Sequence, residues 1–158
     1  MKYNFNHGVF FETLMKGVPY KTSEFNVEIM SINFLKSLKV ELRYPITDVF
    51  IEKNNEKLEK YGIIKEKERE ELKFGGDENI EEKIENNKKI LKQLVEKINV
   101  EKLVSLILDG VLFKTKKIRV ETTLNKNKIY YKHEFQYNLD EEFVYKNLNK
   151  LKTLNLFK

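Results

Sequence analysis

Strict alternation of apolar and polar residues predicts an antiparallel sheet in the N-terminal third of the chain. The clearest case is residues 37–44, where apolar side chains recur at every second position, as in a strand buried on one face. These apolar residues are Leu38, Val40, Leu42 and Tyr44. Alternation at residues 25–29 and 3–7, and a short apolar run at 49–51, predict further strands. Residues 9–16 lie between glycines and fit either a short helix or a strand.

The most regular pattern lies in residues 115–137 and predicts a β-hairpin with its turn at residues 125–128. Two alternating segments flank this turn. Their apolar-patterned faces carry Ile118, Val120, Thr122 and Leu124, then Ile129, Tyr131, His133, Phe135 and Tyr137. After the hairpin, Asn138 and Glu141 resemble a capping box and predict the start of a closing helix.

Apolar residues separated by alternating steps of four and three predict one long amphipathic helix over residues 77–98. The seam consists of Ile80, Ile84, Asn87, Leu91, Leu94 and Ile98. The simpler interpretation is that this stripe packs on the protein's own sheet. The alternative is a homodimer through helix 77–98, in which the polar Asn87 fixes the register.

A second central segment, residues 100–108, is apolar nearly all round and predicts a buried helix capped by Asn99 and ended by Gly110. Because Asp-Gly also favours hairpin turns, a strand over residues 103–108 is the alternative. Residues 54–74 are rich in Lys and Glu and predict an exposed helical stretch.

These elements predict an α+β fold. An N-terminal antiparallel sheet is followed by a central helical segment with one long amphipathic helix, then a C-terminal basic β-hairpin and a closing helix. We expect a single domain over residues 1–158, with Gly75-Gly76 marking a candidate internal boundary at 74–77. No internal repeat is evident in the sequence.

Composition then excludes several classes of function. The 158 residues include no Cys and two His, which excludes thiolate catalysis and cysteine-based metal sites and leaves too few ligands for a histidine site. We expect no metal and no cofactor. The N-terminus has no apolar signal core, and no apolar run is long enough to span a bilayer. We therefore expect a cytoplasmic protein without a membrane partner.

The distribution of charge draws attention to the hairpin. The net charge is +5, yet residues 114–158 alone carry eleven basic and five acidic side chains, a net charge of +6. The candidate anion-binding residues are Lys117, Arg119, Lys126, Lys128, Tyr130 and Lys132. A Lys-rich ribbon with one aromatic side chain predicts contact with the phosphate backbone of RNA or DNA rather than reading of bases.

Catalysis has weaker support. His133 could act as a general acid–base between Tyr131 and Tyr137, but the simpler interpretation is a packed core histidine. Because no catalytic set converges, we expect a non-catalytic binding protein whose partner is another protein. Accessory, inhibitor, immunity or anti-defence factors from AT-rich genomes or mobile elements are of this kind. A nucleic-acid-binding module is the alternative, and an acid–base enzyme using His133 is the third hypothesis.

Overall fold

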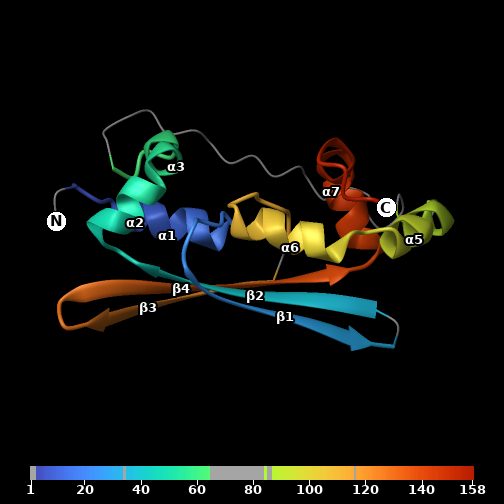
Figure 1. Cartoon of the computed structure of the whole chain (residues 1–158), viewed down its shortest axis with the longest axis horizontal. Coiled ribbons are helices and arrows are strands. Elements are labelled where there is room, and N and C mark those ends of the chain that lie inside the picture. The colour runs from blue at the N-terminus through green and yellow to red at the C-terminus, as the bar shows by residue number, and fades with distance from the viewer. Residues whose placement is uncertain (1–2, 34, 65–83, 85–86, 116) are drawn as a thin grey trace.

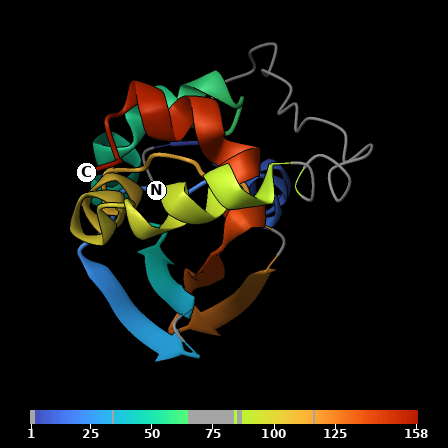
Figure 2. The same ribbon diagram turned by 90° about the vertical axis from the view of Figure 1, so that its right-hand side faces the viewer.

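A computed structural model describes residues 3–33, 35–64, 84, 87–115 and 117–158, and these form a four-stranded antiparallel sheet with helices on one side (Figures 1 and 2). The elements are α1 (His7–Met15), β1 (Glu24–Ile32), β2 (Leu35–Pro45), α2 (Asp48–Lys53), α3 (Asn55–Lys60), α5 (Lys88–Glu96), α6 (Val100–Leu108), β3 (Lys117–Asn125), β4 (Lys128–Leu139) and α7 (Glu141–Thr153). The strand order is β1-β2-β4-β3. The predicted α+β class is therefore confirmed, and the C-terminal hairpin completes the N-terminal sheet.

The two central strands supply most of the sheet's contribution to the core. Alternate side chains of β2 and β4 point to opposite faces, and those facing the helices are buried. The buried set is Leu38, Val40, Leu42, Tyr44, Tyr131, His133, Phe135, Tyr137 and Leu139. The strict alternation seen in the sequence is thus the signature of a sheet that has helices on one face and a polar surface on the other.

Helix caps explain where the predicted strands at residues 3–7 and 49–51 are wrong. The Asn6 side chain accepts a hydrogen bond from the Val9 N–H, and α1 starts at His7 instead of a strand ending there. Thr47 caps α2 in the same way through the Phe50 N–H. A single capping side chain favours the helix more than a few alternating residues favour a strand, because the cap satisfies helix N–H groups that otherwise lack partners.

The structure confirms the predicted helix over residues 100–108 and the predicted hairpin. Residues 100–108 form the predicted helix, and Gly110 follows it with a positive φ of 92°. The predicted hairpin is present, and its two turn residues, Lys126 and Asn127, both have positive φ, as a two-residue turn of this kind requires. The closing helix α7 is capped by Asp140 rather than by the predicted Asn138.

The two halves of the chain repeat one structure, so the expectation of no internal repeat is wrong. Helix α1 starts at His7 and α6 at Val100, 93 residues later. The same offset relates β1 to β3, β2 to β4, and the capping Thr47 to Asp140. In first-half numbering, the residues identical in both halves are Asn6, Gly17, Val18, Lys21, Thr22, Val27, Glu28, Lys39, Glu41, Tyr44, Phe50, Lys53, Asn54, Lys57, Leu58 and Lys65. The candidate boundary at 74–77 lies outside the described residues, between the halves in sequence.

Side-chain contacts repeat along with the elements. The buried Asn54 side chain accepts from the Lys21 N–H at 2.8 Å and donates to the Lys21 carbonyl at 3.0 Å. Asn147, its equivalent, binds Lys114 identically, at 2.8 and 3.2 Å. Each amide also donates to the carbonyl four residues earlier, at 3.1 and 3.0 Å. In each half this clamp ties the helix after the hairpin to the loop before it.

The halves meet at an approximate twofold axis between β2 and β4. Glu41 lies directly opposite Glu134, and these residues are equivalent in the two halves. Lys39 pairs with Glu134 at 2.9 Å, and Lys132 pairs with Glu41 at 2.8 Å, so the ion pairs are related by the same axis. Figure 1 shows α1 and α6 in line over the middle of the sheet, with α2–α3 and α7 towards opposite ends.

The asparagine clamps give the first prediction. We expect Asn54→Ala and Asn147→Ala each to lower the free energy of unfolding by about 2–3 kcal/mol, because each removes a buried amide that bonds three main-chain groups and leaves part-buried main-chain groups without partners. The exposed Asn149, on the same helix as Asn147, serves as the control, and Asn149→Ala should change stability by less than about 0.5 kcal/mol. Urea unfolding measures all three. A large loss in one clamp variant and none in the other would contradict the equivalence of the halves.

Candidate functional site

His133 is a core residue rather than an accessible acid–base group. Its side chain is fully buried, with Nδ1 3.2 Å from the Tyr44 hydroxyl. That hydroxyl accepts from the Tyr20 N–H at 3.0 Å and can donate its own proton to Nδ1. Burial lowers the pKa of His133 to about 3, and the Leu14 main chain offsets only part of this effect. His133 Nε2 has no hydrogen-bond partner among the described residues. A neutral, enclosed imidazole cannot exchange protons with a substrate.

The two tyrosines predicted beside His133 are also enclosed. Burial raises the pKa of Tyr137, whose hydroxyl lies 3.5 Å from the Phe113 carbonyl. The Tyr131 hydroxyl lies 2.8 Å from Nδ1 of His7, a pairing that the sequence did not reveal. Burial raises the pKa of Tyr131 and lowers that of His7. No carboxylate joins this pair, and the described residues contain no cluster of three metal-binding side chains.

The basic hairpin is partly neutralised by its own sheet. Lys132 pairs with Glu41 across the strands, and Arg119 pairs with Glu121 at 2.7 Å. Of the remaining predicted residues, Lys117, Lys126 and Lys128 form no ion pair within the described part of the chain, and Tyr130 is half-buried. The uncompensated charge of the predicted set is thus concentrated at the turn and at the start of β3.

The described apolar residues of the predicted helical seam pack mainly against the protein's own core. Leu91 and Ile98 are buried, whereas Ile84 and Leu94 are half-buried against the core. Asn87 is exposed at the start of α5, a helix that packs against α7. Ile80 lies outside the described residues. This arrangement resembles the simpler interpretation, in which the apolar stripe packs within the protein itself. The helix that carries the stripe, α5, packs against α7 rather than against the sheet.

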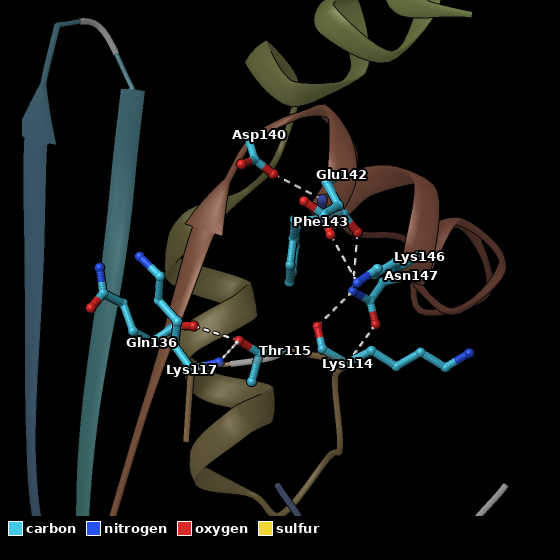
Figure 3. Close-up of polar contacts among 9 residues, drawn as sticks. All are labelled: Lys114, Thr115, Lys117, Gln136, Asp140, Glu142, Phe143, Lys146 and Asn147. Carbon is cyan, nitrogen blue, oxygen red and sulfur yellow. Dashed lines mark hydrogen bonds and ion pairs between the residues drawn. The ribbon is translucent and has the colours of Figure 1, made fainter. Parts of the chain in front are cut away.

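A cleft of about 160 Å³ lies where β4 runs into α7 (Figure 3). Lys114 and Lys117 line it, but their side chains extend in opposite directions. Lys146 pairs with Glu142 at 2.9 Å, and the carboxylate of Asp140 accepts from the Phe143 N–H at 2.9 Å. On the α7 side the polar groups of the cleft are therefore already engaged, whereas Lys114 and Lys117 form no ion pair within the described residues.

Edge strand β1 is a surface feature that the sequence analysis missed. Its face towards the helices carries Phe25, 50% exposed, and Ile29, 56% exposed. The equivalent strand at the other edge, β3, carries Ile118 and Val120 half-buried beside α1. The helices therefore cover equivalent positions of the two edge strands to different extents, and β1 leaves Phe25 and Ile29 half-exposed to solvent.

The main chain of β1 is also open along this edge. The Arg43 carbonyl accepts from the Thr22 hydroxyl on the β1 side, and the Ile46 N–H donates to the Ile129 carbonyl on the β4 side. Because successive main-chain groups of a strand point to alternate sides, odd-numbered residues of β2 face β1. Their partners in β1 are even-numbered. Phe25, Val27 and Ile29 therefore direct their N–H and C=O groups away from the sheet.

Nothing in β1 blocks the addition of another strand. Its register with β2 runs without a bulge from Glu24 to Ile32, and the strand contains no Pro or Lys. Such features normally protect sheet edges from pairing with other chains. An edge that combines open main-chain groups with exposed apolar side chains is a template for an extended segment.

Comparison with known proteins gives no match to any family model, any curated protein or any solved structure. Within the part of the chain that the structure describes, no helix is long and apolar enough to cross a membrane.

The buried histidine gives a prediction about pH. Because the folded-state pKa of His133 lies below the ordinary value of 6.5, the unfolded chain takes up a proton first as the pH falls. His133 should therefore favour folding above pH 6.5, and this contribution should be lost progressively between pH 6.5 and about 3. We expect His133→Val, which introduces the residue found at the equivalent Val40, to reduce the loss of stability between pH 6.5 and 5 by up to about 2 kcal/mol. Urea unfolding at both pH values is the measurement, and an unchanged difference would count against a neutral buried His133.

Proposed function

We propose that this protein is a non-catalytic binding protein that acts through protein–protein interaction, and that an extended segment of the partner adds to the sheet along β1. The observation that carries the proposal is the half-exposed pair Phe25 and Ile29 on a strand whose outer main-chain groups have no partner among the described residues. Main-chain hydrogen bonds would supply affinity, and alternate side chains would supply specificity.

The internal repeat strengthens this proposal by providing a comparison within the molecule. Val27 and Glu28 are identical to their equivalents in β3, whereas Phe25 and Ile29 are replaced there by Ile118 and Thr122. The exposed pair Phe25 and Ile29 is therefore particular to β1, whereas β3 exposes one large apolar side chain, Leu124, close to its turn. Covering what remains exposed of Phe25 and Ile29 would contribute about 1–2 kcal/mol each.

The chemistry of the added segment follows from the two faces of β1. On the face towards the helices, the added segment should place apolar side chains beside Phe25 and Ile29. Towards the polar face its side chains would lie near Glu24 and Glu28, which favours Lys or Arg there. The partner of this proposal is thus a protein segment in which apolar and basic residues alternate.

The other hypotheses have less support. A nucleic-acid interface on the hairpin would use Lys132 and Arg119, which already pair with glutamates. An acid–base enzyme would need His133 to reach a substrate, and its burial opposes that. An accessory, inhibitor, immunity or anti-defence role in the cytoplasm remains the class of function that fits a binding surface without a catalytic centre.

Photo-crosslinking in the source cell tests the proposal. We expect p-benzoylphenylalanine at Phe25 to capture a discrete protein partner, and the same group at Thr122 on the opposite edge to capture none. Ile29→Thr, which copies the β3 residue, should weaken capture about tenfold. Val27→Pro should abolish it, because proline removes an outward N–H while leaving the bonds between β1 and β2.

Circular dichroism of each variant controls for folding. Equal capture from both edges, or capture that survives Val27→Pro in a folded protein, would contradict binding through β1.

A further inference from the structure

Two equivalent lysines reach towards the approximate twofold axis on the helical side of the molecule. Lys57 Nζ donates to the Pro19 carbonyl at 2.8 Å and to the Gly110 carbonyl, which belongs to the other half. Lys150, its equivalent, donates to the Leu112 carbonyl. Pro19 and Leu112 are themselves equivalent, so each half holds its lysine over its own loop.

Aromatic rings hold both ammonium groups in place. Lys57 Nζ lies 5.5 Å from the centroid of the Tyr20 ring, and Lys150 Nζ lies 5.7 Å from that of Phe113. Such contacts favour the cation, and here the rings come from equivalent positions. The two ammonium groups are therefore positioned by the fold and do not sample solvent freely.

Further lysines surround this pair. Burial lowers the pKa of Lys57 to about 8, and repulsion from Lys60, Lys21 and Lys150 adds to the effect. Burial also lowers the pKa of Lys150, with repulsion from Lys114 and Lys60. None of these effects comes from a carboxylate of the described residues. Four ammonium groups, those of Lys21, Lys57, Lys114 and Lys150, thus gather here from separate segments of the chain.

These four lysines form two pairs that are equivalent in the two halves, whereas Lys60 is replaced by Thr153 in the second half. Lys21 and Lys114 are equivalent, and the asparagine clamps hold their main chains. Their side chains form no ion pair within the described residues. Most surface positions differ between the halves, yet both lysine pairs are identical. Figure 1 shows the helices that carry Lys57 and Lys150, α3 and α7, rising on the same side, away from the sheet.

We propose that this lysine cluster, formed by Lys21, Lys57, Lys114 and Lys150, binds an oligophosphate anion that spans the approximate twofold axis. An ammonium group has three donors, of which Lys57 uses two and Lys150 one on carbonyls, so donors remain for a ligand. Compact Lys charges without Arg suit phosphate oxygens as point contacts. Two equivalent lysine pairs match a ligand with two equivalent anionic ends.

Calorimetric titration with tripolyphosphate at constant ionic strength tests this site. We expect binding at least tenfold tighter than that of orthophosphate. The double variant Lys21→Gln/Lys114→Gln should weaken tripolyphosphate binding at least tenfold. Its control, Lys126→Gln/Lys128→Gln at the hairpin turn, removes the same charge and should change binding by less than twofold. Equal weakening by both double variants would overturn the proposal, since net charge alone would then explain binding.

A second measurement uses the unmodified side chains. In ¹³C-labelled protein, the Cε resonance of Lys57 should titrate near pH 8, and tripolyphosphate should move that midpoint to higher pH because an anion stabilises the charged form. An unchanged midpoint would overturn the assignment of Lys57. Binding of single-stranded RNA without binding of tripolyphosphate would also overturn it, in favour of a nucleic-acid site.

Discussion

The pairing of β2 with β4 is the interaction on which the rest of the structure depends. A single two-stranded hairpin cannot bury one face stably, but two hairpins joined side by side give four strands with a continuous core face. The pairing also sets Glu41 opposite Glu134, and like charges in that position oppose association. Lys39 and Lys132 relieve the repulsion because each pairs with the glutamate of the other half. The two halves therefore contribute to one cluster of buried apolar side chains.

Because the halves are equivalent, each is a control for the other. Residues that cap, clamp or turn the chain recur in both, among them Asn6, Gly17 and Asn54. Their retention is explained by the fold. The exposed pair Phe25 and Ile29 has no counterpart at the equivalent positions of β3, where Leu124 near the turn is the exposed apolar side chain, and the lysine cluster needs contributions from both halves. The proposed binding edge therefore occurs once in the molecule, and the proposed anion site is centred on the axis. His133 is replaced by a valine in the other half, which agrees with a role in packing.

The sequence predicts the elements whose pattern is long and strict, and it fails where one side chain decides. Strands β2 and β4 and helix α6 are evident from periodicity. The starts of α1 and α2 are not, because they depend on single caps at Asn6 and Thr47. The repeat is hidden since equivalent roles are filled by different residues, such as Thr47 and Asp140 at helix starts. Neither proposed site could be found from sequence, because β1 and β3 alternate alike and the lysines converge only on folding.

The most direct test of this account is to measure the register of β2 against β4 by nuclear Overhauser effects in labelled protein. Odd-numbered residues of β2 direct their main-chain groups towards β1, so Glu41 and Glu134 form a pair without hydrogen bonds to each other. The Cα atoms of such a pair lie about 4.5 Å apart, which brings their Hα protons into close contact. The account predicts a strong Hα–Hα cross-peak between Glu41 and Glu134. A strong Hα–Hα cross-peak from Glu41 to another residue of β4, in place of Glu134, would show a shifted register, and it would contradict both the twofold relation and the sites derived from it.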